Sequence, residues 1–172
     1  MIPPASRPAP LPSTARRISI GEFEVAAGQE RLAIYGLGSC VAVLLHDREA
    51  GLSALGHILL PSPPRADAPG IPGRFAATAI PAMVAALAGR GGQLRQLVAK
   101  LAGAAQMFQF ERVPEEEGIG ARNLRAALST LERLGIPVAA RDVGGAYGRT
   151  IVVEGATGRM EVRAVRVEER IL

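Results

Sequence analysis

The sequence predicts an α/β (α+β) domain, a layered sandwich in which two main helices pack on a mixed β-sheet. Three observations support this fold class. Short apolar runs of strand length recur along the chain, two longer segments carry apolar residues at helical spacing, and glycines or prolines separate them. Strands interspersed with helices bury their apolar faces against one another, which produces layers.

The apolar runs give the expected strands in chain order. Residues 41–45 and 52–60 are predicted to form a β-hairpin, because only a short segment, 47–51, separates them. Further strands are expected at 31–35, 94–102, 136–140, 150–153 and 160–167, the last two as a terminal hairpin. The glycine-rich segment 141–148 is predicted to be a loop.

Two segments have helical periodicity. The alanine-rich segment 75–88 places Ile80, Val84 and Leu87 on one face, and Pro81 within it predicts a kink or a later start. The segment 119–134 is predicted to be the second helix. Its apolar stripe consists of Leu124, Leu128 and Leu131, and Gly135 provides the stop.

The domain organisation follows from length and from the distribution of proline. The chain has 172 residues, enough for one domain with a hydrophobic core, which we assign to residues 16–172. Residues 1–15 contain five prolines and little to bury, so we expect a disordered tail. The proline-rich stretch 61–72 is predicted to be a surface loop. Neither a secretory signal nor a run of ~20 apolar residues is visible, so a cytoplasmic protein without membrane insertion is expected.

Composition excludes several classes of function. The formal charge is +4, carried almost entirely by arginine, but no basic run has interleaved aromatic residues, which argues against nucleic-acid binding. A single cysteine excludes an internal disulfide. With two histidines and one cysteine there is no zinc-type ligand motif, so neither a metal nor an organic cofactor is expected.

Cys40 is the first candidate for chemistry. It follows a glycine-containing turn, 36–39, and precedes a buried-looking strand. Backbone N–H groups of such a turn, with Gly38 and Ser39 as candidates, could favour a thiolate and stabilise an oxyanion. The alternative is that Cys40 is a small buried core residue, which is the commoner role of a lone cysteine beside an apolar strand.

His57 is the candidate base. It lies among aliphatic residues, where a histidine is usually a satisfied core residue, but the predicted hairpin brings its end of the strand toward Cys40. The Cys40–His57 pair would then be an activated nucleophile and its base. His46 competes for this role but is expected near the hairpin tip, away from Cys40.

The chain from about residue 18 resembles the CheD family of chemoreceptor glutamine deamidases. Six segments carry the resemblance in the family's order, at 36–43, 56–61, 100–108, 119–123, 135–138 and 142–149. The resemblance implies a layered α/β sandwich and a chemotaxis enzyme that converts glutamines on the cytoplasmic helices of methyl-accepting chemoreceptors to glutamate. It further implies Cys40 as nucleophile, His57 as base and a CheC-type phosphatase as a binding partner.

The chain departs from the family pattern at two positions. The family's third catalytic residue is a threonine six places before the cysteine, and Ile34 stands there. Ile34 cannot hydrogen-bond an imidazole, so the orienting role would pass to a backbone carbonyl, to Ser39 or to a distant residue such as Thr150. Phe75 stands where the family usually has a tyrosine, a milder change.

Two other functions therefore stay open at the level of sequence. One is a catalytically weak or inactive CheD-like module that docks on chemoreceptors or on a phosphatase, which Ile34 favours. The other is a different cysteine hydrolase, such as a small-amide amidase or a thiol protease, which would need a deep pocket for its substrate.

Overall fold

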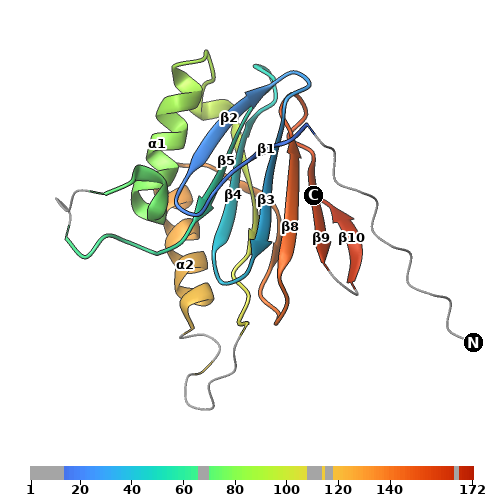
Figure 1. Ribbon diagram of the computed structural model, residues 1–172. Helices are drawn as coiled ribbons and strands as arrows, with labels where there is room; N and C mark the ends of the chain where they lie inside the picture. Colours follow the sequence, from blue (N-terminus) through green and yellow to red (C-terminus); the bar gives the residue numbers. More distant parts are fainter. Residues whose placement is uncertain (1–13, 66–69, 108–113, 115–117, 165–166) are drawn as a thin grey trace, which may run out of the picture.

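The computed structural model describes residues 14–65, 70–107, 114, 118–164 and 167–172. The predicted disordered tail, 1–15, lies almost entirely outside the described residues, as do parts of the proline-rich loop and of the family segment 100–108. The described chain forms three layers, with two helices on one side, a central sheet, and an outer sheet on the other side (Figure 1).

The central sheet has the order β2-β5-β4-β6-β7. Its strands are β2 (Phe23–Ala27), β5 (Leu52–Ile58), β4 (Val41–Asp47), β6 (Leu97–Gly103) and β7 (Val138–Val143). All neighbours are antiparallel except β6 and β7, which are parallel. The sheet is therefore mixed, and the predicted hairpin of β4 and β5 lies at its centre.

The outer sheet has the order β1-β3-β8-β9-β10. Its strands are β1 (Arg16–Arg17), β3 (Arg31–Leu37), β8 (Arg149–Glu154), β9 (Met160–Ala164) and β10 (Val167–Ile171). The pair β1–β3 is parallel and the others are antiparallel. The terminal hairpin expected from the sequence is the pair β8–β9, to which β10 adds an edge.

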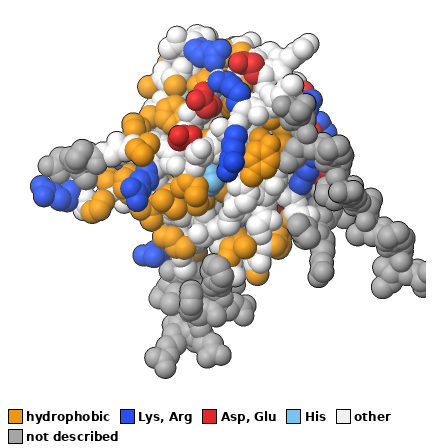
Figure 2. All heavy atoms as spheres, viewed as in Figure 1, with side chains coloured by type: hydrophobic (Ala, Val, Ile, Leu, Met, Phe, Trp, Pro, Cys, Tyr) orange, Lys and Arg blue, Asp and Glu red, His pale blue; other side chains and the backbone are white. Residues whose placement is uncertain are grey.

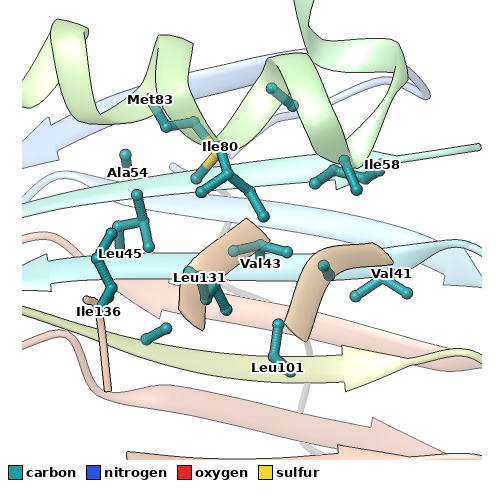
Figure 3. Close-up of a cluster of buried hydrophobic side chains, with 14 of the residues drawn as sticks. Val41, Val43, Leu45, Ala54, Ile58, Ile80, Met83, Leu101, Leu131 and Ile136 are labelled. Carbon is teal, nitrogen blue, oxygen red and sulfur yellow. The ribbon is translucent and has the colours of Figure 1, made fainter. Parts of the chain in front are cut away.

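The helices α1 (Ala76–Ala88) and α2 (Ile119–Arg133) cover one face of the central sheet. Figure 3 shows Ile80 and Met83 of α1 and Leu131 of α2 packed over Val43 and its neighbours on the sheet. Short 3₁₀ turns precede α1 (η1, Pro72–Arg74) and β6 (η2, Leu94–Gln96). This helical cover buries one face of β4 completely.

Strand β4 is buried on both faces because it lies between two cores. Val41, Val43 and Leu45 belong to the core under the helices, whereas Ala42 and Leu44 belong to the core between the two sheets. A strand buried on both faces has a continuous apolar sequence instead of an alternating one, and residues 41–45 are all apolar. The position of a residue along β4 therefore decides which of the two cores its side chain enters.

The fold class predicted from the sequence is confirmed, but several boundaries were wrong. Pro81 lies inside an uninterrupted α1, so the later start is not observed. β7 begins only after Pro137 and continues to Val143, into the segment predicted as a loop. The end of β7 was assigned to the loop because Arg141 and Asp142 are polar and precede a glycine-rich stretch. The short edge strands β1, β2 and β10 were not predicted as separate strands.

Candidate active site

Cys40 and His57 lie on the same face of the central sheet. His57 pairs with Ala42 in the register of β4 and β5, and Cys40 is two residues before Ala42. Side chains two residues apart on a strand share a face, and diagonal neighbours across an antiparallel pair are within reach of one another. The structure thus brings the two candidates to the same end of the hairpin, on the side that faces the outer sheet.

His46 is placed elsewhere. Five rungs of the hairpin ladder separate its partner, Ser53, from the end where Cys40 lies. Its Nδ1 contacts the Ser53 hydroxyl at 3.0 Å and the Leu52 carbonyl at 3.1 Å, so the buried ring is satisfied locally. His46 is therefore a structural histidine, and of the two histidines only His57 lies at the Cys40 end.

Both members of the candidate pair are nearly buried. Cys40 is 7% exposed and His57 4%. Burial raises the pKa of the Cys40 thiol, and its own backbone N–H lowers that pKa by less. Burial also lowers the pKa of His57, and the nearby Ile18 backbone opposes this shift to a lesser extent. At neutral pH the resting pair is therefore a neutral thiol and a neutral imidazole.

The surroundings of His57 come from the segment between β1 and β2. The His57 backbone donates to the Glu22 carbonyl at 2.9 Å and accepts from Gly21 N–H at 2.8 Å. The Ile18 backbone lies against the ring, and Nδ1 of His57 is buried with no hydrogen-bond partner. The backbone of His57 is therefore held by the 18–22 segment, while Nδ1 of the ring has no hydrogen-bond partner.

Ile34 occupies the position of the family's threonine and is fully buried. It pairs with Ile151 of β8 and belongs to the apolar core between the sheets, together with Ile18. The Ile18 N–H donates to the Ala33 carbonyl at 2.8 Å, so Ile18 continues the pairing of β1 beside β3. The apolar Ile34 thus fits its surroundings.

The turn that carries Cys40 is fixed by its carbonyl groups. Ala105 N–H donates to the Gly38 carbonyl at 3.0 Å, the Asn123 side chain donates to the Ser39 carbonyl at 3.1 Å, and Ala104 N–H donates to the Cys40 carbonyl at 2.8 Å. In a trans peptide the carbonyl and the following N–H point in opposite directions. The N–H groups of Ser39 and Cys40 therefore point away from these anchors.

The segment that anchors the Cys40 turn, residues 103–106 (the anchoring loop), has a strained backbone. Gly103 has φ +101°, and a Cβ there would lie 2.4 Å from the Cys40 carbonyl oxygen. Ala104 has φ +53°, which is uncommon for a residue with a side chain. Strain of this kind persists where the surrounding structure fixes it, and it gathers at functional sites.

A buried ion pair between Asp142 and Arg149 lies next to the segment that hydrogen-bonds the anchoring loop. Arg149 is 2% exposed, and its Nε and Nη2 donate to one carboxylate oxygen of Asp142 at 3.0 and 2.8 Å. The segment after Asp142 meets the anchoring loop, because Gly144 N–H donates to the Gly103 carbonyl and Gln106 N–H to the Gly145 carbonyl, both at 2.8 Å. The ion pair therefore stabilises the support of the Cys40 turn.

Sequence reasoning missed Asn123, the Asp142–Arg149 pair and the role of Ile18 at this site. One signal was available for Asn123, which falls between Gly120 and Ala127 on the buried face of α2. A polar residue on the core face of an amphipathic helix needs a partner, and here that partner is the Cys40 turn.

Exposed apolar side chains lie next to the 36–39 turn. Tyr35 is 36% and Met107 44% exposed, and the Met107 side chain lies 3.1 Å from the point where a Cβ on Gly38 would be. Arg17 lies over the Tyr35 ring, 5.8 Å from its centroid. Figure 2 shows hydrophobic and basic side chains around a small area of histidine, with acidic side chains toward one end of the face.

A family model described as CheD chemotactic sensory transduction matches residues 59–164. The probable chemoreceptor glutamine deamidase CheD 3 of Geobacter sulfurreducens is 43% identical over 150 residues, which cover 87% of this chain and 93% of that protein. The probable chemoreceptor glutamine deamidase CheD of Geobacillus kaustophilus is 41% identical over 160 residues, which cover 91% and 97%.

A more distant match, the probable chemoreceptor glutamine deamidase CheD of Clostridium botulinum, is 32% identical over 157 residues, covering 91% of this chain and 97% of that protein. Among solved structures, a crystal structure of Bacillus licheniformis hypothetical protein YfiH matches 75% of this chain and 58% of that one, with a TM-score of 0.45 and 13% identity. That last likeness is too weak to support a conclusion about activity.

Proposed function

This chain belongs to the CheD family of chemoreceptor glutamine deamidases, and on that premise we propose that Cys40 and His57 carry out the deamidation. The substrate is a glutamine side chain on a chemoreceptor, and the products are glutamate and ammonia. The observation that supports these two residues most directly is their placement on one face of the hairpin, at the same end.

The reaction begins from a neutral pair. As Cys40 Sγ attacks the glutamine amide carbon, His57 takes the thiol proton, so that no thiolate has to exist in the resting enzyme. The outward N–H groups of Ser39 and Cys40 stabilise the oxyanion of the tetrahedral intermediate. Gly38, a candidate donor from the sequence, instead contributes through its anchored carbonyl.

The intermediate collapses when the carbon–nitrogen bond breaks and the imidazolium gives its proton to the departing ammonia. A thioester between Cys40 and the substrate remains. His57 then takes a proton from water, the water oxygen attacks the thioester, and glutamate leaves as the proton returns to Cys40 sulfur. In this proposal the main chain at Ile18, which lies near the ring, takes the orienting role of a threonine hydroxyl during these transfers.

The substrate is accepted at the surface around Tyr35 and Met107. A glutamine on a helix presents a long side chain from a convex surface, and an exposed apolar rim suits such a surface better than a deep pocket does. This geometry favours a protein substrate over the small free amide that another type of cysteine amidase would take.

Two further proposals follow from the family resemblance. Because the substrate glutamines lie on the cytoplasmic helices of methyl-accepting receptors, the protein would act in the cytoplasm. A CheC-type phosphatase would be a second partner. No helix within the described ranges is long and apolar enough to cross a membrane.

The test is mass spectrometry of receptor cytoplasmic fragments before and after incubation with the protein. Cys40→Ser and His57→Ala are expected to abolish the conversion of amide to acid, whereas His46→Ala keeps it, provided that this control variant still folds. Undiminished turnover by Cys40→Ser would refute the mechanism. Receptor binding without turnover by the unaltered chain would instead support a docking module.

A further inference from the structure

The side chain of Asn123 joins the two halves of the candidate site. It lies in the second turn of α2 and is completely buried. Its Nδ2 donates to the Ser39 carbonyl at 3.1 Å and to the Leu59 carbonyl at 2.8 Å. Ser39 immediately precedes Cys40, and Leu59 is two residues after His57, so one amide group links the nucleophile turn to the strand of the base.

This link lies just beyond the last backbone pair of β4 and β5. The last pair of the β4–β5 register is Val41 with Ile58. Beyond it the chain at Leu59 turns toward η1, and Leu59 N–H donates to the Arg74 carbonyl at 3.1 Å. Asn123 therefore connects the two strands at the point where they separate, and Cys40 lies there.

The chemistry of the link requires a primary amide. Two carbonyl oxygens converge on one group, and a side-chain NH₂ offers two donors in one plane. A carboxylate of the same shape would repel both oxygens, and an apolar side chain would leave both without this donor. The Oδ1 of Asn123 is itself buried with no hydrogen-bond partner, so the arrangement is kept although it leaves one polar atom unsatisfied.

The first turns of α2 also pack against the loop that anchors Cys40. A Cβ at Gly120 would lie 2.6 Å from the Ala104 carbonyl oxygen, so this close approach needs glycine. Gly120 and Asn123 lie one turn apart on the same buried face. The helix thus contacts the anchoring loop and the nucleophile turn with neighbouring residues.

We propose that Asn123 is a positioning residue, whose side-chain amide fixes the Cys40 turn relative to the His57 strand so that thiol and imidazole can exchange a proton. The inference rests on the proposed Cys40–His57 chemistry. It assigns to α2 a part in catalysis beyond packing: the helix sets the spacing of two groups on strands that it covers.

The experiment compares Asn123→Ala with Thr130→Ala in the receptor-fragment deamidation assay. Thr130 is a matched control, because it is also buried on α2 and its hydroxyl donates to the Ala126 carbonyl within the helix, at 2.8 Å. Asn123→Ala is expected to lower kcat by about 10²-fold with KM little changed, since misplacement by a single ångström can have that effect. Thr130→Ala should lower the thermal midpoint without a comparable loss of kcat.

Asn123→Ser provides a graded second variant if Asn123→Ala does not fold. A hydroxyl can donate one hydrogen bond, so its kcat should fall between those of the unaltered chain and an inactive one. Cys40→Ala is assayed in parallel. If Cys40→Ala is inactive while a folded Asn123 variant keeps full kcat, the positioning role is refuted and the proposed function stands. If Cys40→Ala retains turnover, the proposed mechanism itself fails.

Discussion

At the scale of single residues, the site depends on two groups whose charged forms are both disfavoured. Burial lowers the pKa of His57, which keeps the imidazole neutral and able to accept a proton. Burial raises the pKa of Cys40, which keeps the thiol protonated. Proton transfer from Cys40 to His57 is therefore coupled to attack on the substrate, and the resting site contains no reactive thiolate.

This protonation state predicts the pH dependence of two measurements. Turnover should stay on a plateau from below the ordinary histidine pKa of about 6.5 to above the ordinary cysteine pKa of about 8.5, because both shifts widen the neutral range. Alkylation of Cys40 by iodoacetamide should remain slow across that range. Fast alkylation at pH 6 that does not rise with pH would show a preformed thiolate and contradict this assignment.

A second prediction at this scale concerns Ile34. Ile34→Thr restores the family residue but places a hydroxyl in the apolar core beside Ile151, which should destabilise the fold by about 1–3 kcal/mol. Because the proposed mechanism gives the orienting role to the main chain at Ile18, kcat should not rise. Urea unfolding and the deamidation assay measure the two effects. A large gain in kcat would show that His57 lacks an orienting group in this chain.

At the scale of elements, strand pairing was easier to predict than the contacts that complete the site. The hairpin of β4 and β5 follows from two apolar runs and a short turn, and it alone aligns Cys40 with His57. Nothing local in the sequence indicates that the loop after β6 supplies donors to the Cys40 turn, because those contacts join Ala104 to Cys40 and Ala105 to Gly38, which are far apart in the sequence. The edge strand β2 was missed because it has only five residues and no clear alternation of apolar and polar side chains.

The end of β6, at Gly103, gives a prediction of its own. Gly103→Ala should abolish most of the activity, because the new Cβ would meet the Cys40 carbonyl oxygen, in addition to backbone strain of about 1–3 kcal/mol at positive φ. Gly91→Ala is the control. Gly91 has a similar φ of +97°, but its surroundings are open, so the variant carries the strain without the collision.

Thermal unfolding and the deamidation assay separate the effect of backbone strain from the effect of the collision in Gly103→Ala and Gly91→Ala. Both variants should lose stability, and only Gly103→Ala should lose turnover beyond what its unfolded fraction explains. Equal activity in the two variants would mean that the exact position of the Cys40 carbonyl does not matter.

At the scale of the whole molecule, the three layers enclose two apolar cores, one under the helices and one between the sheets. The core under the helices holds β4 and β5 in place and includes Ala104 of the loop that anchors Cys40, whereas the core between the sheets includes Cys40 itself. The sequence indicated helices packed on a sheet. It did not indicate that the strands divide into two stacked sheets, because which strands pair over long separations is not encoded in local periodicity.

Burial of both histidines predicts how the stability of the whole domain depends on pH. Burial lowers the pKa of His57 and of His46, with the Leu52 backbone opposing the shift at His46 and the charge of Lys100 adding to it. In the unfolded chain both rings take up a proton near pH 6.5, whereas the folded domain resists protonation until lower pH. Their contribution to stability is therefore fully present above pH 6.5 and is lost as the pH falls through the folded-state values.

The urea midpoint should thus decrease between pH 8 and pH 5.5, a range above the ordinary carboxylate pKa of about 4. His57→Gln removes a titrating ring while keeping a polar side chain, so its midpoint should change less over the same range. Replacing His46 as well should flatten the dependence further. A decrease as steep in the double variant as in the unaltered chain would mean that other groups govern the effect and that neither imidazole is held neutral by the fold.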